Sequence, residues 1–579
     1  MKILRGVPAS EGVARGPWVR VEPPQSPAGR TIEAGEAEAE LARLAAASAR
    51  AAGELEVLAE RLTGAGHPDE GAIFAAQAAM ARDPALAALA QEAVRGRDMD
   101  AVGAILDAGA ALADQLGGLG DELLAARAAD VRDVAGRIAR RAAGLSDPGG
   151  LSLPGPSVVV AKDLAPSVAA TLPRDRLLGF ALETGSPTAH AAILARAYGI
   201  PAVVGVSGLL AALARPEFAA AELAVDGGSG EVVIAPDAVA AANLDRRAHV
   251  ARLADETARV EAALPAVTRD GLEIALLANI GTPGEATRAV ELGARGAGLF
   301  RTEFLFLERP AAPTEEEQLR VYRAAVEAFA PHPVTLRLLD VGGDKPIPYI
   351  RIAPEANPFL GVRALRLAAQ EPGLFLAQLR AAMRAAVAGP VKVMAPMVAD
   401  AGDAATLLDL AGRARADLEA RGDAFAPVAL GVMLEIPSAI LVGDSYFPRL
   451  SFASLGTNDL LQYTLASDRG NAALRRYQDP MHPALLRLVH EAVERAAAAR
   501  IELSVCGEMA GDPVAALALV GLGIRQLSMA AGSLAAVRRA VRAVTAQSVR
   551  EEAERALADA SAAEARDRFT RLLAATTAP

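Results

Sequence analysis

The chain has 579 residues, a formal net charge of -11 and a sequence pI of about 5.3. This length predicts roughly two to four domains, and the acidic balance argues against nucleic acid or an anionic membrane as the main partner. The single cysteine excludes an intrachain disulfide. The N-terminus reaches Pro and Ser before an apolar stretch develops, and charges interrupt every long apolar run, so we expect a soluble, cytoplasmic protein.

The first 263 residues alternate between strand-like and helical patterns. Residues 1–25 contain short strand-like pieces between Gly and Pro, whereas 26–144 is rich in helix formers at helical spacing and predicts about four helices. From 145 to 237 the pattern returns to short apolar runs, which are typical of buried strands. We therefore expect an α/β domain formed by 1–25 and 145–237, a helical bundle inserted at 26–144, and a connecting helix over 238–263.

A regular alternation of strands and helices follows from 264 to 579. The strand candidates are EIALLANI, GAGLFRTE, VTLRLLDV, VKVMAPMV, VALGVMLEI, FASLGTND, ELSVCGE and QLSMA. Eight is the number at which a parallel sheet of this kind closes, so the pattern favours a (β/α)8 barrel over an open doubly wound sheet.

Polar side chains stand at the end of nearly every predicted barrel strand. Catalytic residues of (β/α)8 barrels gather at these ends, because the loops that follow the strands meet there. We expect one site to contain Asn279, Arg301, Glu303, Arg337, Asp340, Met397, Glu435, Asn458, Asp459, Cys506, Glu508 and Ser528.

The residue types at these ends suit a small polyanion and a metal ion. Arginine binds phosphate and carboxylate in a bidentate manner, whereas carboxylate oxygens are ligands that Mg²⁺ prefers. Glu435 and Asp459 are the candidate Mg²⁺ ligands, although carboxylates at such positions are also frequent helix caps. Four arginines can converge on one anion, namely Arg301, Arg337, Arg363 and Arg469.

Two further residues are candidates for a direct part in the reaction. Cys506 is either a small buried apolar side chain or, at the barrel mouth, an acid, base or nucleophile. His190 follows a Gly-Ser-Pro-Thr-Ala loop and starts a predicted helix, where backbone N–H groups and the helix dipole favour anions. An imidazole there could carry a phosphoryl group, or it could simply cap or pack the first helical turn.

Several long blocks of sequence are more specific than any single residue. They are ETGSPTAHAAILARAYGIPAVVG, GLFRTEFLFLERPAAPTEEEQ, LRLLDVGGDKPIPY, NPFLGVRALR, GVMLEIPSA, SLGTNDLLQYTLASDRGN and SVCGEMAGDP. In these blocks the chain resembles Enzyme I of the phosphoenolpyruvate:sugar phosphotransferase system, a phosphoenolpyruvate–protein phosphotransferase. The resemblance covers almost the whole length, from GVPASEGVARG near the start to GLGIRQLSMA near the end.

The resemblance implies a role for each matching residue. His190 would take the phosphoryl group of phosphoenolpyruvate, and Cys506 would donate the proton that completes pyruvate. Glu435 and Asp459 would bind Mg²⁺. The substrate would be held by Arg301, Arg337, Lys345, Arg363, Asn458, Asp459 and Arg469.

The resemblance also implies partners. The helical insert would dock a small HPr-type phosphocarrier protein, whose histidine receives the phosphoryl group, and the barrel would form a homodimer. The carrier-binding face would contain Asp69, Glu70, Gln77 and Asp83. The chain departs from the usual family pattern at Ala189, which lacks a hydroxyl, and at Gln77, where the family often has histidine.

Two other interpretations fit part of the pattern. A pyruvate,phosphate dikinase-like enzyme shares the phosphohistidine and barrel modules, but it needs a nucleotide-binding domain. The segment before His190 is instead a helical insert without a Gly-rich phosphate loop. A catalytically weak regulatory or scaffold homologue would not need the arginine, carboxylate and cysteine set that this chain retains.

Overall fold

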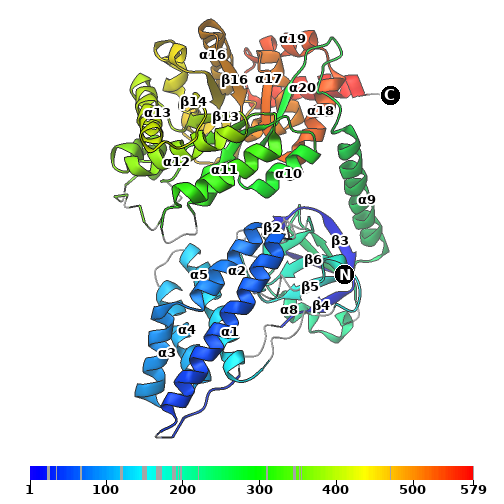
Figure 1. The fold of residues 1–579 in the computed structure, drawn as a ribbon. Coiled ribbons are helices and arrows are strands. Elements are labelled where there is room, and N and C mark those ends of the chain that lie inside the picture. Colours follow the sequence, from blue (N-terminus) through cyan, green and yellow to red (C-terminus); the bar gives the residue numbers. More distant parts are fainter. Residues whose placement is uncertain are drawn as a thin grey trace. The chain divides into compact units, whose positions relative to one another are not determined.

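The computed structural model divides into two compact units, Met1–Asp255 and Glu256–Pro579 (Figure 1). It describes the chain except residues 23–26, 34, 65–67, 118–121, 146–152, 165–167, 169–171, 186–190, 193–194, 196–198, 220, 308–310, 343–346, 348, 351, 354, 470 and 578–579. His190 and Lys345 belong to these exceptions. No helix within the described ranges combines the length and apolar character that crossing a bilayer requires.

The N-terminal helical segment forms a bundle whose core is rich in alanine. Its described helices are α1 (Ala37–Gly64), α2 (Pro68–Met80), α3 (Pro84–Arg97), α4 (Ala101–Gly117) and α5 (Glu122–Ala142). The predicted bundle is confirmed, but five helices are present in the described part where the pattern predicted about four. Ala51 and Ala90 are fully buried in its core. A Cβ atom at Gly109 on α4 would lie 2.3 Å from Ala135 on α5, so this close crossing requires glycine.

The described strands of the first unit form two sheets. One has the order β2-β7-β6-β5-β4 and the other β1-β9-β8-β3. Their bounds are β1 (Lys2–Arg5), β2 (Val7–Ser10), β3 (Val13–Gly16), β4 (Trp18–Arg20), β5 (Ser157–Ala161), β6 (Leu177–Leu182), β7 (Ala202–Val204), β8 (Leu223–Asp226) and β9 (Glu231–Ile234). The predicted α/β character is therefore confirmed, since β5, β6 and β7 are parallel neighbours with mostly buried residues.

The described part of this unit also contains the helices α8 (Leu209–Leu213) and α9 (Ala238–Glu261). The boundary between the two units falls within α9. A continuous helix is therefore present where the sequence predicted the connecting helix.

The second unit is a closed parallel barrel, as the strand pattern predicted. Its strands are β10 (Ala275–Ile280), β11 (Ala297–Arg301), β12 (Val334–Arg337), β13 (Val391–Ala395), β14 (Ala429–Leu434), β15 (Phe452–Leu455), β16 (Glu502–Val505) and β17 (Gln526–Met529). Closure follows because β10 pairs in parallel with both β11 and β17. The alternative of an open doubly wound sheet is excluded.

Helices connect and cover the barrel strands (Figure 1). They are α10 (Pro283–Glu291), α11 (Glu315–Phe329), α12 (Pro372–Ala385), α13 (Ala401–Arg421), α14 (Pro437–Leu441), α15 (Thr457–Leu465), α16 (Pro483–Ala499), α17 (Pro513–Leu522), α18 (Leu534–Ala543), α19 (Ala546–Ala556) and α20 (Ala562–Thr577). The C-terminal helix α20 belongs to the same core, since Ala565 and Phe569 are fully buried in it.

Glu315, at the start of α11, ties three helices of the barrel unit together. Its carboxylate accepts hydrogen bonds from Arg380 and Arg384 of α12, at 2.7 and 2.8 Å, and from Arg421 of α13, at 2.7 Å. Burial alone would raise the pKa of this carboxyl group. The hydrogen bonds from the three arginines outweigh burial and lower the pKa to about 2.

We expect Glu315→Gln to lower the unfolding temperature by about 2–4 °C at neutral pH. The pKa of Glu315 lies below its usual 4.5, so its carboxylate stabilises the fold above pH 4.5, and this stabilisation is lost as the pH falls toward 2. The deficit should therefore be smaller near pH 3 than near pH 7. Glu316→Gln, which changes a neighbouring carboxylate that is 67% exposed, is the control. An equal deficit at both pH values would contradict the assignment.

Candidate active site

The C-terminal mouth of the barrel holds a cavity of about 710 Å³. Its lining contains ten of the residues that the sequence placed at strand ends or in the substrate site. They are Arg301, Glu303, Arg337, Asp340, Glu435, Asn458, Asp459, Arg469, Cys506 and Glu508. The structure therefore brings together side chains that follow β11, β12, β14, β15 and β16.

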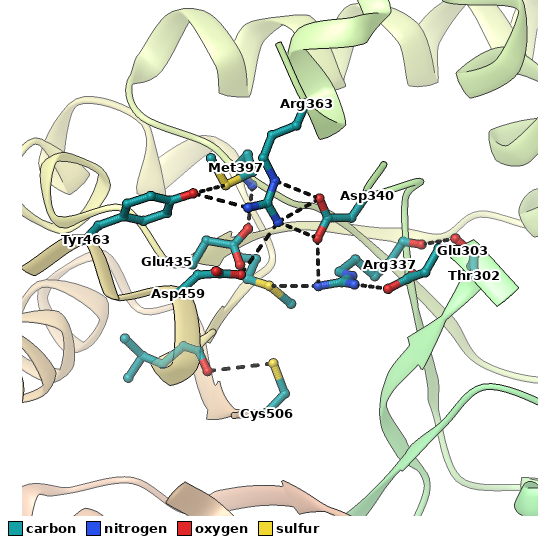
Figure 2. A network of polar contacts seen from close by, with 12 residues as sticks. Thr302, Glu303, Arg337, Asp340, Arg363, Met397, Glu435, Asp459, Tyr463 and Cys506 are labelled. Carbon is teal, nitrogen blue, oxygen red and sulfur yellow. Dashed lines mark hydrogen bonds and ion pairs between the residues drawn. The ribbon is translucent and has the colours of Figure 1, made fainter. Parts of the chain in front are cut away.

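Arg337, at the end of β12, belongs to a buried charge network and lies between Asp340 and Glu303 (Figure 2). Its guanidinium group donates a hydrogen bond to Glu303 and lies 3.3 Å from Asp340 Oδ2. Burial lowers the pKa of Arg337, but the charges of the two carboxylates outweigh burial and raise it above its usual value. The Arg337 Nε atom is buried and has no hydrogen-bond partner among the described residues, so one donor of this guanidinium group is not used by the network.

Arg363 extends this network on the side of Asp459. Its Nη2 atom donates to both oxygens of Asp340 at 3.0 Å and lies 3.6 Å from Asp459 Oδ2. Its Nη1 atom donates to the Tyr463 hydroxyl at 3.2 Å. Arg363 does not appear among the described residues that line the cavity. In this structure Arg363 holds the carboxylates of Asp340 and Asp459. Its contact with substrate stays a prediction.

Glu435, which follows β14, is an almost completely buried carboxyl group (1% exposed). Its Oε1 atom accepts a hydrogen bond of 2.6 Å from the backbone N–H of Met397. Met397 has a φ of 55°, a left-handed conformation that costs energy in a residue other than glycine and that directs this N–H at the carboxylate. Burial, followed by the negative charges of Asp340 and Asp459, raises the pKa of Glu435 to about 8.

The charge balance of this network fits a divalent cation. Its buried members are Glu303, Asp340, Glu435, Asp459, Arg337 and Arg363, so the carboxylates outnumber the guanidinium groups by four to two. A divalent cation would balance this excess and favour the ionised form of Glu435. Asp459 Oδ1 is also buried without a hydrogen-bond partner among the described residues.

Glu435 and Asp459 therefore fit Mg²⁺, which is typically held by one or two carboxylates together with water and substrate oxygens. Within the described residues, no three His, Cys, Asp or Glu side chains gather as a metal cluster.

Cys506 lines the cavity and directly follows β16. It is 3% exposed and packs among Leu299, Met433 and Phe452. Burial raises the pKa of its thiol to about 11, so the group stays protonated at neutral pH. Asn279 donates a hydrogen bond of 2.9 Å to the Cys506 carbonyl oxygen, which fixes the backbone that carries the thiol. The residue is buried among apolar side chains and also lines the cavity, and its role as an acid stays a prediction.

Arg301 and Arg469 differ from the two network arginines in their surroundings. Both line the cavity, and neither guanidinium group forms an ion pair within the part of the chain that the structure describes. Their charges can therefore act on a bound anion. Asn458 also lines the cavity, and its Oδ1 atom accepts the backbone N–H of Glu508 at 3.0 Å.

Some residues lie outside this arrangement or were missed. His190 and Lys345 lie outside the described residues, so their roles stay predictions. Tyr463, which was not identified from the sequence, stands four residues after Asp459 on α15, a spacing that places both on one helical face. Arg566 of α20 also lines the cavity. No local pattern marks it, because α20 is far from the cavity strands in sequence.

The predicted carrier-binding residues lie around α2 and α3. Gln77 is 1% exposed and donates a hydrogen bond of 2.9 Å to Asp130 of α5. This burial does not fit the predicted contact with a carrier, and the structure instead makes Gln77 a packing residue between two helices. Asp83 is exposed and caps α3, accepting the Ala85 N–H at 2.7 Å. The side chains of Asp69 and Glu70 are outside the description.

Comparison with known families places the chain among the enzymes that use phosphoenolpyruvate. The family described as "PEP-utilising enzyme, PEP-binding domain" matches residues 255–546. The families for the N-terminal and mobile domains of these enzymes match residues 5–127 and 153–230. All eight barrel strands, and the lining residues of the cavity other than Arg566, lie within the first of these matches.

Curated relatives narrow the assignment. The chain is 43% identical to "Phosphoenolpyruvate-protein phosphotransferase" of Streptomyces coelicolor, over 97% of this chain and 98% of the relative. It is 37% identical to the protein of the same name from Staphylococcus carnosus, over 98% of each chain. The chain belongs to the phosphoenolpyruvate–protein phosphotransferase family.

A solved structure covers the N-terminal part. It is described as a solution structure of "Enzyme I (nEIt) protein", and it matches 43% of this chain and 99% of its own at 30% identity, with a TM-score of 0.36. The fold assignment of this chain rests on its own strand pairing.

Proposed function

We propose that the protein phosphorylates itself on His190 with phosphoenolpyruvate and passes the phosphoryl group to a histidine of a small HPr-type carrier protein, releasing pyruvate. The observation that carries this proposal is the barrel mouth. It holds two arginines, Arg301 and Arg469, that form no ion pair with a described residue, next to the buried arginine and carboxylate network around Arg337. This set suits a small substrate with a phosphate and a carboxylate, because arginine binds both groups in a bidentate manner.

The chemistry divides between binding and proton delivery. The bond between phosphorus and the enol oxygen breaks, a bond from phosphorus to an imidazole nitrogen of His190 forms, and enolpyruvate leaves. The Cys506 thiol then gives its proton to the enol carbon, which yields pyruvate, and solvent returns a proton to sulfur. Positioning and charge neutralisation provide most of the acceleration in phosphoryl transfer. Arg301, Arg337 and Arg469 supply them, and Lys345, Arg363, Asn458 and Asp459 complete the substrate site.

Glu435 and Asp459 would hold Mg²⁺, as their burial and the excess of carboxylates support. When bound, this ion would neutralise charge on the phosphate and on the enolate oxygen. The protein itself contributes the two carboxylates and the Met397 N–H that holds one of them in place.

The partners follow from the same proposal. The carrier docks on the helical bundle near Asp69, Glu70 and Asp83, and the barrel forms a homodimer. The protein acts in the cytoplasm, where phosphoenolpyruvate is available. Gln77 is left out of the docking surface because of its burial.

Incubation with phosphoenolpyruvate labelled on phosphorus tests the proposal. We expect acid-labile label on the wild-type protein that requires Mg²⁺ and is lost in His190→Ala. The control is His490→Ala, which removes a histidine on α16 that is 43% exposed. Label that survives His190→Ala would point to another acceptor residue. Absence of label in the wild type would favour the regulatory or scaffold alternative, and label from ATP would favour the dikinase-like one.

A further inference from the structure

Arg566, on the C-terminal helix α20, joins two loops of the barrel mouth. Its Nε and Nη2 atoms donate to the two oxygens of Asp479, at 3.0 and 2.8 Å. Its Nη1 atom donates to Asp512 Oδ2 at 2.6 Å. Asp479 lies in the segment between α15 and α16, whereas Asp512 lies in the segment that follows Cys506. One guanidinium group therefore bridges two segments that border the cavity.

Each of these aspartates also fixes backbone at the start of a helix. Asp479 Oδ1 accepts the N–H of Met481 at 2.9 Å, just before α16. Asp512 Oδ1 accepts the N–H of Val514 at 3.0 Å and caps α17. The bridge thus holds the starts of two helices in a fixed relation, and bidentate pairs of this kind specify geometry as well as charge.

The segment that contains Asp479 also holds Arg469, a candidate for binding substrate, in place. Gln478, next to Asp479, donates from Nε2 to the carbonyl oxygens of Asp468, Arg469 and Asn471, at 3.2, 3.1 and 3.2 Å. The backbone N–H of Arg469 is held on the other side by Gln462 Oε1 at 3.1 Å. The position of the Arg469 side chain therefore depends on where Gln478 stands.

The positive charge of Arg566 is already paired with two carboxylates. Three of its five N–H groups bond to two carboxylates, so the three side chains together carry one negative charge. The hydrogen bond to Asp479 raises the pKa of Arg566 above its usual value. A guanidinium group that is paired in this way is poorly suited to bind an anionic substrate, although it lines the cavity.

We propose that Arg566 is a positioning residue for substrate binding, which places Arg469 through Asp479 and Gln478 and aligns that segment with the one that follows Cys506. The proposal rests on the proposed function, because it concerns binding of phosphoenolpyruvate. Arg566 stands on α20 and is not one of the polar residues that the sequence placed at the ends of the barrel strands. Misplacing a binding group by about 1 Å is enough to weaken catalysis by up to about 10²-fold.

The test compares Arg566→Gln with a matched change on the same helix. Arg568 forms an equally bidentate pair with Asp559, both bonds being 2.7 Å, but it does not line the cavity in the described set. We expect Arg566→Gln to raise KM for phosphoenolpyruvate about tenfold with a smaller effect on kcat, as for loss of substrate binding. Arg568→Gln should change both constants less than about twofold, with a similar loss of thermal stability.

Asp479→Asn separates positioning from direct contact with substrate. If Arg566 acts through the bridge, Asp479→Asn raises KM as Arg566→Gln does, and the double variant is no worse than either single one. If Arg566 itself holds the substrate, Asp479→Asn frees its charge and KM stays the same or falls, which would overturn the proposal.

A readout without substrate keeps the two proposals distinguishable. Arg476 is an exposed trypsin site in the bridged segment. We expect trypsin to cut there faster in Arg566→Gln than in wild type or Arg568→Gln. Equal cleavage, together with KM values within twofold of the Arg568→Gln control, would refute the positioning role while wild-type labelling still supports the proposed function. A wild type without label would refute the proposed function, and the cleavage comparison would still decide whether the bridge orders the segment.

Discussion

Arg337→Met is expected to destabilise the barrel unit by about 3–5 kcal/mol and to reduce phosphoenolpyruvate-dependent labelling by at least about 10²–10³-fold. The first effect arises because Arg337 is the charged partner of Glu303, whose carboxylate is 1% exposed. The substitution removes the cation that hydrogen-bonds to this buried carboxylate, and breaking a buried ion pair by removing one partner is strongly destabilising. The second effect arises because Arg337 lines the cavity, where its positive charge can neutralise a bound phosphate or carboxylate.

The double variant Glu303→Gln/Arg337→Met separates the two effects. Its unfolding temperature should return toward the wild-type value, because both charges of this buried pair are removed together. Labelling should stay as low as in the single variant, because no guanidinium group remains at the end of β12. Thermal unfolding and single-turnover labelling measure the two quantities independently. A double variant that labels at the wild-type rate would show that Arg337 supports the fold without acting on substrate.

The sequence predicted the barrel and most of its site for one physical reason. Parallel strands that are buried on both faces appear as short apolar runs, and their ends meet at one mouth. Listing the polar residue after each run therefore located Arg337, Glu435 and Cys506 without knowledge of their contacts. Each of these three side chains lines the same cavity.

Contacts between distant segments could not be predicted in the same way. The sequence offered Arg363 as a substrate ligand, but a residue type cannot reveal that Asp340 already occupies its guanidinium group. Similarly, Gln77 stands on a helix whose pattern does not reveal which face is covered by α5. Arg566 lies on the last helix of the chain, and only the closed barrel brings it beside Asp479 and Asp512.

The network also explains how two kinds of arginine serve one site. Arg363 donates to Asp340 and to Tyr463, so it holds these groups at fixed positions. Arg301 and Arg469 carry charge that no described carboxylate neutralises by an ion pair. Because preorganised charges need little rearrangement when the substrate arrives, this division favours stabilisation of a developing negative charge.

Cys506→Ala is expected to slow steady-state pyruvate formation by roughly 10²–10⁴-fold, the range for removal of a general acid. Burial keeps the pKa of this thiol at about 11, so the acidic form is fully populated at neutral pH. Between about pH 6 and pH 9, ionisation of Cys506 should therefore not lower the wild-type rate of pyruvate formation. Asn279, which donates to the Cys506 carbonyl oxygen, keeps the backbone in place in both proteins.

Two measurements distinguish a missing proton donor from a damaged site. Binding of phosphoenolpyruvate by Cys506→Ala should stay within about threefold of wild type, because the thiol is not one of the charged groups that hold the substrate. In Cys506→Ala, enolpyruvate would leave the site and take up its proton from bulk solvent on either face. In deuterated water, the wild type should therefore form a chiral methyl group from stereospecifically labelled substrate, whereas the variant should form a racemic one. Methyl chirality that is retained in the variant would mean that another group of the cavity delivers the proton. Loss of chirality together with unchanged substrate binding would assign the proton to the buried thiol, whose high pKa makes it a weak nucleophile but a persistent acid.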